Sequence, residues 1–351
     1  MIPKNRTAII SGVTGQDGSY LSDLLIGMGY TVVGLIRRSS LDSKDRLSRI
    51  SHIIGHPQFI VECADVTDFS SLARVILKYK PDEFYNLAAQ SYVHDSFYCP
   101  TSTFEINAIG PLNILEAVRQ FSPNTKVYQA STSEMFGRSY SYEVNGNIVH
   151  SNTDILPVEE LPSKPFQYEG TPFQPQSPYS VAKAAAHYSV QLYRRSYGLF
   201  ACAGILFNHE SPRRGDIFVT RKITKWIGEY IRSGSSIEFP KLRLGNIDSY
   251  RDWGHAKDYV YAMYLMLQRE SPEDYVVSTM ETHTVREFLE EAFGAFNLNY
   301  KDHFVQDPKF MRPAEVSYLL GDSTKFRNDT GWKPKYSFKD LVREMVLSDA
   351  P

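Results

Sequence analysis

The sequence predicts an α/β protein in which a doubly wound parallel sheet is followed by a smaller mixed α/β C-terminal lobe. Strand and helix patterns alternate through the first half of the chain, a glycine-rich turn separates the first strand from the first helix, and the alternation breaks after about residue 210. Repeated strand–helix units place parallel strands in one sheet with helices on both faces. We therefore expect a first domain over 1–205, including a long loop at 138–178. The remainder, 206–351, is expected to form mainly the C-terminal lobe, with some segments returning to the first domain.

Short apolar runs bounded by turn residues predict the strands, and apolar residues at helical spacing predict the helices. The expected strands cover 7–11, 30–37, 59–63, 83–87, 126–130 and 201–208. The expected helices cover 20–28, 70–79, 111–121 and 179–197 in the first domain, and 218–233, 257–269 and 285–296 in the C-terminal lobe.

The composition argues for a packed enzyme rather than a nucleic-acid or membrane protein. Hydrophobic residues make up 42% of the 351 residues, and the net charge of -2 provides no broad field to attract either partner. No apolar stretch approaches the length of about 20 residues that a membrane helix needs, and the N-terminus lacks a signal-peptide pattern. The three scattered cysteines are expected to be reduced, as in a cytoplasmic enzyme, and no metal-ligand spacing is visible.

The turn at 12–18 reads GVTGQDG and lies between the first strand and the first helix. Gly12 permits a tight turn, Gly15 lets a pyrophosphate approach the backbone, and Gly18 allows close packing of helix on strand. The N-terminus of the following helix favours an anion. The sequence therefore predicts a dinucleotide-binding site. Its expected residues are Gly12, Thr14, Gly15, Gln16, Asp17 and Gly18.

The ends of the next strands predict which dinucleotide is bound. Arg37, Arg38 and Ser39 stand where an acidic residue would bind a ribose 2′-hydroxyl, and they suit a 2′-phosphate instead, so NADP is preferred over NAD. A solvated basic edge is the alternative. Asp65 and Val66 follow the third strand and are expected near the adenine, although an aspartate there is also a common helix cap. The small residues after the fourth strand are expected beside the cofactor. They are Leu87, Ala88 and Ala89.

Tyr179 and Lys183 lie four residues apart and share one face of the predicted helix. A lysine charge held near a phenol lowers the pKa of the phenol, and such a tyrosine can take a hydroxyl proton while a hydride leaves the same carbon. Thr132 can share that hydrogen bond. Glu134 adds a carboxylate that alcohol oxidation alone does not need, so the pattern indicates elimination of water by a sugar dehydratase.

With these motifs the chain resembles the extended short-chain dehydrogenase/reductase family, and within it the branch of GDP-mannose 4,6-dehydratases. A Ser-Thr-Ser-Glu element such as 131–134 also occurs in nucleotide-sugar decarboxylases of the family, so the downstream motifs make the distinction. They read LFNHESPRRG at 206–215, FVTRK at 218–222, RDWGHAKD at 251–258 and RPAEV at 312–316.

The resemblance implies a Rossmann-like fold, NADP as cofactor and a GDP-sugar as substrate. Tyr179, Lys183, His209 and Arg214 would touch the cofactor. Arginines suit a diphosphate because they give bidentate contacts, and a carboxylate at Glu315 can accept from guanine. The substrate-binding positions implied are Gln90, Ser91, Ser133, Asn208, Arg213, Val219, Lys222, Arg251, Arg312 and Glu315.

The family also implies a homotetramer, or a homodimer, in which 39–49 reaches the cofactor of a neighbouring subunit. In the expected reaction, Tyr179 with Thr132 and Lys183 takes the C4 hydroxyl proton while C4 hydride passes to NADP. Glu134 then removes the C5 proton and helps to expel the C6 hydroxyl as water. Hydride returns to C6 and Tyr179 reprotonates C5, so no net redox change occurs.

The chain departs from the family in the proline-rich segment between Glu134 and Tyr179, which is longer than expected. A loop of this length is typical of function or disorder, and a tolerated surface insertion and a flap over the sugar pocket both remain open. The main alternative substrate is a GDP-manno-heptose. A 4-epimerase would not need Glu134, a decarboxylase would use a glucuronate sugar, and a non-catalytic sensor would gain nothing from all four catalytic residues.

Overall fold

The structure is a computed structural model that describes residues 6–41, 44–311 and 316–350. The chain divides into two compact units. The first unit contains Met1–Met135, Ser177–Leu206 and Tyr259–Tyr275, and the second contains Phe136–Gln176, Phe207–Asp258 and Val276–Pro351. None of the helices in the described ranges is both long and apolar enough to cross a membrane.

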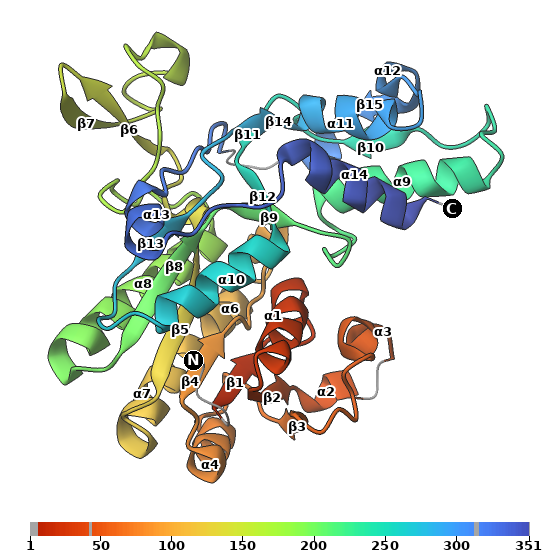
Figure 1. Cartoon of the computed structure of the whole chain (residues 1–351). Coiled ribbons are helices and arrows are strands. Elements are labelled where there is room, and N and C mark those ends of the chain that lie inside the picture. The colour runs from red at the N-terminus through yellow and green to blue at the C-terminus, as the bar shows by residue number, and fades with distance from the viewer. Residues whose placement is uncertain (1–5, 42–43, 312–315, 351) are drawn as a thin grey trace. The chain divides into compact units, whose positions relative to one another are not determined.

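A seven-stranded sheet organises the first unit, with the order β13-β8-β5-β4-β1-β2-β3 (Figure 1). The pairs β1–β2, β2–β3, β1–β4, β4–β5 and β5–β8 are all parallel. Chain order runs one way from β1 to β3 and the other way from β4 outward, so the order reverses between β1 and β4, where such sheets bind ligands. The strands are β1 (Thr7–Ser11), β2 (Thr31–Ile36), β3 (Phe59–Cys63), β4 (Glu83–Asn86), β5 (Lys126–Thr132), β8 (Ala201–Leu206) and β13 (Tyr275–Val277).

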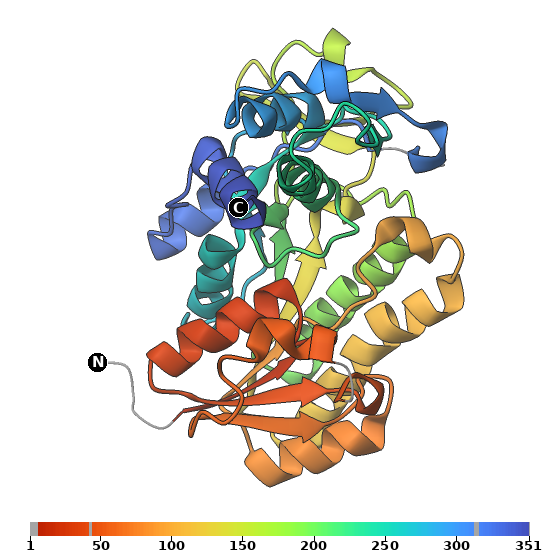
Figure 2. The ribbon, with the colours of Figure 1, turned by 90° about the vertical axis from the view of Figure 1, so that its right-hand side faces the viewer.

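Helices cover both faces of this sheet, which confirms the predicted doubly wound architecture (Figures 1 and 2). One face packs against α4 (Phe69–Tyr79), α7 (Gly110–Phe121) and α8 (Pro178–Tyr197) through a continuous apolar core that includes Val75, Leu115 and Val190. The other face carries α1 (Gln16–Gly27) and α10 (Ala256–Leu267). The shorter helices are α2 (Arg38–Leu41), α3 (Lys44–Leu47), η1 (Ser48–Ile50), α5 (Val93–Ser96), α6 (Pro100–Phe104), the π-helix η2 (Glu105–Ile109) and η3 (Ser133–Met135).

The start of α8 is fixed by local sequence. The Ser177 hydroxyl accepts a hydrogen bond from the backbone N–H of Ser180, and the Ser180 hydroxyl accepts one from the Ser177 N–H. Pro178 occupies the first helical turn. Such reciprocal caps satisfy N–H groups that a helix start leaves unpaired. The helix ends at Gly198, which adopts the left-handed conformation (φ 65°) that favours glycine. These signals place Tyr179 in the first turn and Lys183 one turn later.

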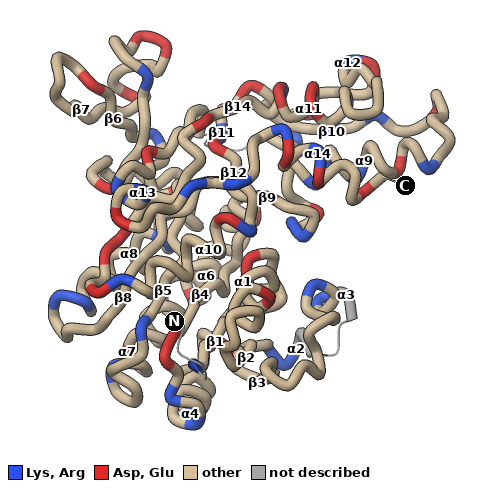
Figure 3. The backbone as a smooth tube through the Cα atoms, viewed as in Figure 1, with Lys and Arg blue, Asp and Glu red and all other residues tan. Residues whose placement is uncertain are grey.

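The second unit combines helices with four two-stranded sheets, and its core joins α9, α11 and α14 to β10 and β12. Both basic and acidic residues lie along these helices (Figure 3). The helices are α9 (Val219–Arg232), α11 (Val285–Gly294), α12 (Tyr300–His303), α13 (Thr324–Thr330) and α14 (Phe338–Asp349), with short turns η4 (Val158–Glu160) and η5 (Pro308–Phe310). The sheets pair β6 (Ser139–Val144) with β7 (Asn147–Asn152), β9 (Asn208–Glu210) with β12 (Trp253–His255), β10 (Leu242–Leu244) with β15 (Phe304–Gln306), and β11 (Tyr250–Arg251) with β14 (His283–Thr284).

Three parts of the chain differ from the sequence predictions: a strand, a helix and the long loop. The strand expected over 201–208 is divided, because β8 ends at Leu206 and β9 pairs with β12 instead. The helix expected in the C-terminal lobe over 257–269 lies in the first unit from Tyr259 onward, where Tyr264 packs edge-on against Tyr30 and the Leu267 carbonyl accepts from Lys126.

The segment expected as a long loop of the first domain is partly regular and belongs to the second unit. It contains the antiparallel hairpin β6–β7, and its return path bonds Phe166 to Ser141 of β6 through two main-chain hydrogen bonds of 2.8 Å. Further main-chain bonds join Gln167 to Leu320 and Asp322. These hydrogen bonds pair backbone groups of the hairpin and of its return path, which a buried loop without partners would leave unsatisfied.

Candidate active site

The glycine-rich turn after β1 is built so that only glycine fits at two positions. Gly12 has φ +72°, and a Cβ there would lie 2.7 Å from the carbonyl carbon of Leu87 after β4. A Cβ on Gly18 would collide with the backbone of Gly12 and Val13. The predicted roles of these two glycines in the turn and in helix packing are therefore confirmed. Gly15 is the N-cap of α1, so the turn lies at a helix N-terminus, the end of a helix that favours an anion.

A cavity of about 470 Å³ opens at the carboxyl ends of β1 and β4. Half of the predicted cofactor residues line it, among them Arg37 at the end of β2. The predicted residues in its wall are Gly12, Thr14, Gly15, Arg37, Asp65, Val66, Leu87, Ala88, Ala89, Gln90 and Ser91. The sequence analysis did not include five further lining residues, Ser11, Leu35, Ile36, Ala64 and Ile106.

Other predicted cofactor residues of the first unit lie outside this wall. Gln16 is buried and donates to Asp17 at 2.9 Å, so its amide supports the helix start. Gly18 packs against the turn itself. Arg38 and Ser39 are exposed in α2, one and two residues beyond Arg37.

The cavity fits a dinucleotide in position, shape and chemistry. It lies where the strand order reverses, which is the usual ligand position in such sheets, and its volume falls within the range of small-molecule sites. Gly12 and Gly15, which carry no side chain, line it together with Thr14 of the same turn. Arg37 supplies a cation, and Asp65 supplies a carboxylate that also accepts from Thr67 at 2.9 Å.

A buried asparagine that the sequence analysis missed holds the loop after β4. Asn107 lies in the π-helix η2, accepts from the Gln90 N–H at 2.9 Å and donates to the Gln90 carbonyl at 2.9 Å. On the other side, the Ser11 hydroxyl accepts from the Ala88 N–H at 3.3 Å. Single-turn π-helices are frequent at functional sites, but the sequence carries no clear local signal for one.

Lys183 is buried against the carboxyl end of β5. Its Nζ donates to the carbonyl of Ala130 at 2.9 Å and lies 5.9 Å from the ring centroid of Tyr179. Burial lowers the pKa of Lys183 to about 8, and the more distant carboxylate of Asp17 opposes that shift. The predicted pairing of the lysine with the tyrosine ring along α8 is therefore present in the structure.

Thr132 and Glu134 lie where β5 ends and η3 begins. The Thr132 hydroxyl accepts from the backbone N–H of Glu134 at 3.3 Å, so the two side chains are fixed by one short turn. Helix α8 packs against both β5 and η3. The structure thus brings the four predicted catalytic residues, Thr132, Glu134, Tyr179 and Lys183, into neighbouring elements of one unit.

A chain of polar contacts continues along α8 behind Lys183, and the sequence analysis did not predict it. His187 is buried and lies 3.1 Å from the Ser131 hydroxyl, one residue before Thr132. One carboxylate oxygen of Asp274 pairs with Arg194 at 2.5 Å, and the other accepts from the Ala203 N–H of β8 at 2.8 Å. These contacts fix the register of α8 on the sheet. They join residues distant in sequence, which local patterns cannot reveal.

Several predicted ligand residues lie in the second unit. Asn208 and His209 belong to β9, and the His209 Nδ1 lies 2.8 Å from the Phe207 carbonyl. Arg214 pairs with Glu210 at 3.0 Å and stacks on Phe218.

Two elements, α9 and β11, carry three of the other second-unit candidates. Val219 and Lys222 are in the first turn of α9, and the Lys222 Nζ lies 4.5 Å from the Phe310 ring centroid. Arg251 is buried in β11 and donates to the Tyr250 carbonyl at 2.8 Å. Arg213 lies in the turn after β9. Arg312 and Glu315 lie outside the described residues.

No group of three or more His, Cys, Asp or Glu side chains within the described ranges is arranged to hold a metal ion. All three cysteines are free thiols. Cys63 and Cys99 are exposed, while burial raises the pKa of Cys202 well above its ordinary value.

Comparisons with known proteins agree along nearly the whole chain. A family model described as GDP-mannose 4,6 dehydratase matches residues 9–148 and 160–345. The chain is 48% identical to GDP-mannose 4,6 dehydratase 2 of Arabidopsis thaliana, over 99% of this chain and 88% of that protein. It is 42% identical to GDP-mannose 4,6 dehydratase of Homo sapiens, over 99% of this chain and 92% of that protein.

Solved structures share the fold at lower sequence identity. A dTDP-glucose 4,6-dehydratase from Bacillus anthracis, in complex with NAD, has a TM-score of 0.77 and 23% identity, covering 98% of this chain and 96% of its own. RMD from Pseudomonas aeruginosa, complexed with NADPH, has a TM-score of 0.75 and 22% identity, covering 98% of each chain.

Proposed function

Because the chain belongs to the GDP-mannose 4,6-dehydratase family, we propose that it converts GDP-D-mannose to GDP-4-keto-6-deoxy-D-mannose and water. The observation that carries this proposal is the placement of Glu134 beside a tyrosine–lysine pair in adjoining elements of the first unit. The curated relatives are named for GDP-mannose, which favours this sugar over a GDP-manno-heptose. An epimerase would have no use for Glu134, which disfavours that activity.

The proposed chemistry divides between the catalytic side chains. A nicotinamide dinucleotide, when bound, supplies the hydride acceptor for sugar C4 and the hydride donor for C6. Tyr179 takes the proton of the C4 hydroxyl, helped by the Thr132 hydroxyl and by the charge on Lys183. The C4 ketone acidifies the C5 hydrogen, which Glu134 removes. Glu134 then protonates the departing C6 hydroxyl, so that water leaves, and Tyr179 returns its proton to C5.

We propose that the cofactor is NADP, held in the cavity of the first unit, with Tyr179 and Lys183 beside its nicotinamide end. Support comes from the Gly12–Gly18 turn and from Arg37. Among the described residues that line the cavity, Arg37 is the only one with a cationic side chain. An arginine suits a 2′-phosphate because it can form charge-assisted, bidentate hydrogen bonds. His209 and Arg214 are proposed to complete the cofactor site.

Replacing Arg37 by alanine is expected to weaken NADP binding by about 10- to 100-fold, the magnitude of one lost hydrogen bond to a charged group, and to leave NAD binding nearly unchanged. Calorimetric titration of both nucleotides measures this difference. Arg195→Ala, at an exposed position of α8, is the matched control. Equal losses for NADP and NAD would contradict a 2′-phosphate contact at Arg37.

We propose that the GDP moiety is bound by second-unit residues. Arg213, Lys222 and Arg251 carry the positive charge that a diphosphate needs. Burial lowers the pKa of Lys222, whose ammonium faces the Phe310 ring, so an incoming phosphate would restore the preference for the charged form. The other proposed substrate contacts are Gln90, Ser91 and Ser133 of the first unit, together with Asn208, Val219, Arg312 and Glu315.

We propose that the chain forms a homo-oligomer, a dimer or a tetramer. Helix α8 exposes Val181, Tyr188 and Leu192 at helical spacing on one face. An exposed apolar stripe on one face of a long helix suits a second copy of the same surface. A reducing, cytoplasmic location is proposed because the three cysteines are free thiols.

The test of the proposed function is mass spectrometry of GDP-mannose incubated with the purified protein and a catalytic amount of NADP. We expect the nucleotide sugar to lose the mass of one water while no net reduced cofactor accumulates. An unchanged GDP-mannose mass with protein that binds NADP would contradict the proposal.

A further inference from the structure

Gln167 is a buried glutamine whose backbone and side chain both bind a distant segment of the second unit. Its N–H donates to the Leu320 carbonyl at 2.8 Å, and its carbonyl accepts from the Asp322 N–H at 2.8 Å. The side-chain Oε1 accepts from the Leu320 N–H at 2.9 Å. Its Nε2 donates to the carbonyls of Ser139 and Tyr318 at 3.3 Å and 3.5 Å. One residue therefore ties β6 to the segment 318–322.

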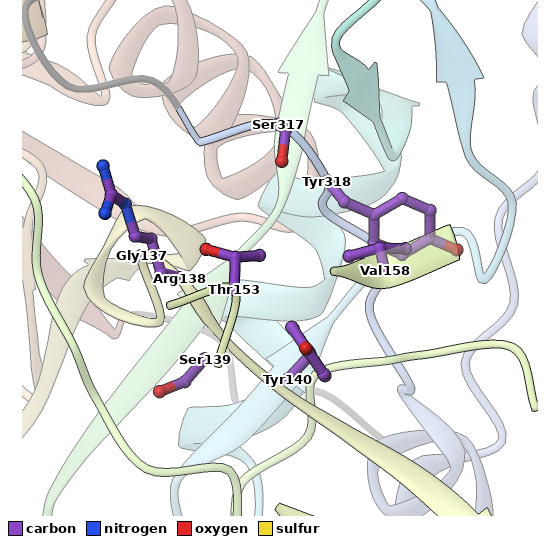
Figure 4. Close-up of a pocket in the computed structure, with 8 residues that line it drawn as sticks. All are labelled: Gly137, Arg138, Ser139, Tyr140, Thr153, Val158, Ser317 and Tyr318. Carbon is purple, nitrogen blue, oxygen red and sulfur yellow. The ribbon is translucent and has the colours of Figure 1, made fainter. Parts of the chain in front are cut away.

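The contact between β6 and the segment 318–322, called here the joint, is tightly packed around the partners of Gln167. Arg138, Ser139 and Tyr140 at the base of the hairpin line a gap of about 10 Å³ together with Ser317 and Tyr318 (Figure 4). A gap of that size holds about one water molecule. The joint is therefore a structural contact between two segments and leaves no room for a ligand.

The segment bound by Gln167 also holds the strand that carries Arg251. The Tyr250 N–H donates to the Ser317 carbonyl at 2.8 Å, and the Tyr250 carbonyl accepts from the Leu319 N–H at 3.2 Å. The Asp252 carboxylate accepts from the Gly321 N–H at 3.3 Å. Both sequence neighbours of Arg251 are thus fixed to the segment that Gln167 clamps.

The hairpin β6–β7 and the turn after it include residues that the family model does not match. The family match runs to 148 and resumes at 160, so it omits most of β7 and the turn that follows. Phe166 and Gln167 form the return path of this segment, and they connect it to β6 and to 318–322. The residues that the family model omits are therefore joined, through the matched residues Phe166 and Gln167, to a strand that the proposed function uses.

We propose that Gln167 is a positioning residue for the diphosphate end of the substrate, through which the hairpin segment 136–176 sets the position of Arg251. This inference rests on the proposed function, because it assigns Arg251 to the GDP moiety. Gln167 acts on substrate affinity and not on the chemical steps, since the catalytic residues lie in the first unit. The hairpin is then an element of specificity for the nucleoside diphosphate and not a passive insertion.

The first variant is Gln167→Ala, examined by calorimetric titration with GDP alone and by steady-state kinetics with GDP-mannose. Mutations along a coupling network change binding by roughly 2- to 30-fold, and we expect a loss of about tenfold in GDP affinity with a matching rise in KM. The expected kcat and NADP affinity are unchanged. Gln174→Ala is the matched control, because Gln174 lies in the same segment and bonds Asp154 within it.

The second variant, Gln167→Glu, separates positioning from a general loss of packing. Its carboxylate still accepts from the Leu320 N–H, but only the protonated acid can donate to the Ser139 or Tyr318 carbonyl. Burial raises the pKa of a carboxyl group, so this glutamate becomes protonated as the pH falls. We therefore expect the GDP affinity of Gln167→Glu, relative to the unchanged protein at each pH, to recover toward acidic pH.

Wild-type GDP affinity and kcat in Gln167→Ala, with NADP binding intact, would overturn the positioning role. A fall in kcat without a change in KM would also overturn it. If Gln167→Ala does not bind NADP, the pH series of Gln167→Glu decides, and a ratio that stays constant with pH counts against the proposal. Failure of the unchanged protein to dehydrate GDP-mannose would instead refute the proposed function, whatever the Gln167 variants do.

Discussion

Replacing Glu134 by glutamine is expected to slow the loss of water by about 10²- to 10⁴-fold, the usual contribution of one general acid–base group, while oxidation at C4 continues. Glutamine keeps the size of the side chain and its place after Thr132, but it cannot take the C5 proton or protonate the C6 hydroxyl. The measurement is rapid mixing with GDP-mannose, following reduced nicotinamide by absorbance and dehydrated product by mass. We expect reduced cofactor to form and persist on the variant enzyme.

Glu143→Gln is the control for this variant, because Glu143 is an exposed carboxylate of β6 in the second unit. It should dehydrate GDP-mannose at the unchanged rate. If Glu134→Gln releases water normally, Glu134 is not the acid–base group. If it fails even to form reduced cofactor, the carboxylate is needed before C5 deprotonation, which contradicts the assigned role.

Replacing Tyr179 by phenylalanine is expected to lower kcat by about 10²- to 10⁴-fold, because no group then accepts the C4 hydroxyl proton. Unlike the Glu134 variant, this enzyme should not form reduced cofactor when it is mixed with GDP-mannose. NADP and GDP binding should remain, since the ring that packs near Lys183 is retained. Tyr188→Phe, at an exposed position of the same helix, is the control. Substantial reduced cofactor in Tyr179→Phe would contradict the role of the phenol.

The pH dependence of the rate tests the partner of this tyrosine. Burial lowers the pKa of Lys183 to about 8, so the ammonium is present below that pH and is lost as the pH rises through it. The phenolate needs that charge, and we expect kcat/KM to fall above about pH 8. Lys183→Arg keeps the charge at all of these pH values, so its lower rate should show no such fall. A fall of the same size in both enzymes would exclude Lys183 as its cause.

Most of the first unit could be predicted because its signals are local. β1 and β3 have the predicted bounds, and the ends of α8 coincide with Ser177 and Gly198, residues whose chemistry starts or ends helices. The two glycines of the turn follow from sterics that any residue with a Cβ would violate. β13 was not predicted, because a three-residue edge strand is too short to show periodicity.

The hairpin β6–β7 could have been recognised. Asn145 and Gly146 have φ values of 50° and 79°, as a two-residue hairpin turn requires, and an Asn-Gly pair between alternating residues is the strongest local signal for one. The prolines that follow drew attention to a loop instead. That the segment packs in the second unit depends on Gln167 and its partners near residue 320, and no local pattern contains this information.

In the candidate site, too, local motifs could be predicted from the sequence, whereas residues held by distant contacts could not. The glycine-rich turn, Arg37 and the four proposed catalytic residues were predicted from short motifs, and the structure places these motifs in elements of one unit. Asn107, His187 and Asp274 support the site through contacts across long stretches of sequence. Residues of this kind are specified by the fold as a whole, so they emerge only once the elements are assembled.

The most direct test of the central claim uses GDP-mannose labelled with deuterium at C4. If Thr132, Glu134, Tyr179 and Lys183 carry out an internal oxidation, elimination and reduction, the product should lose one water and retain the deuterium at C6, with no net reduced cofactor. Loss of the label to solvent, or label remaining at C4 in a dehydrated product, would contradict the account.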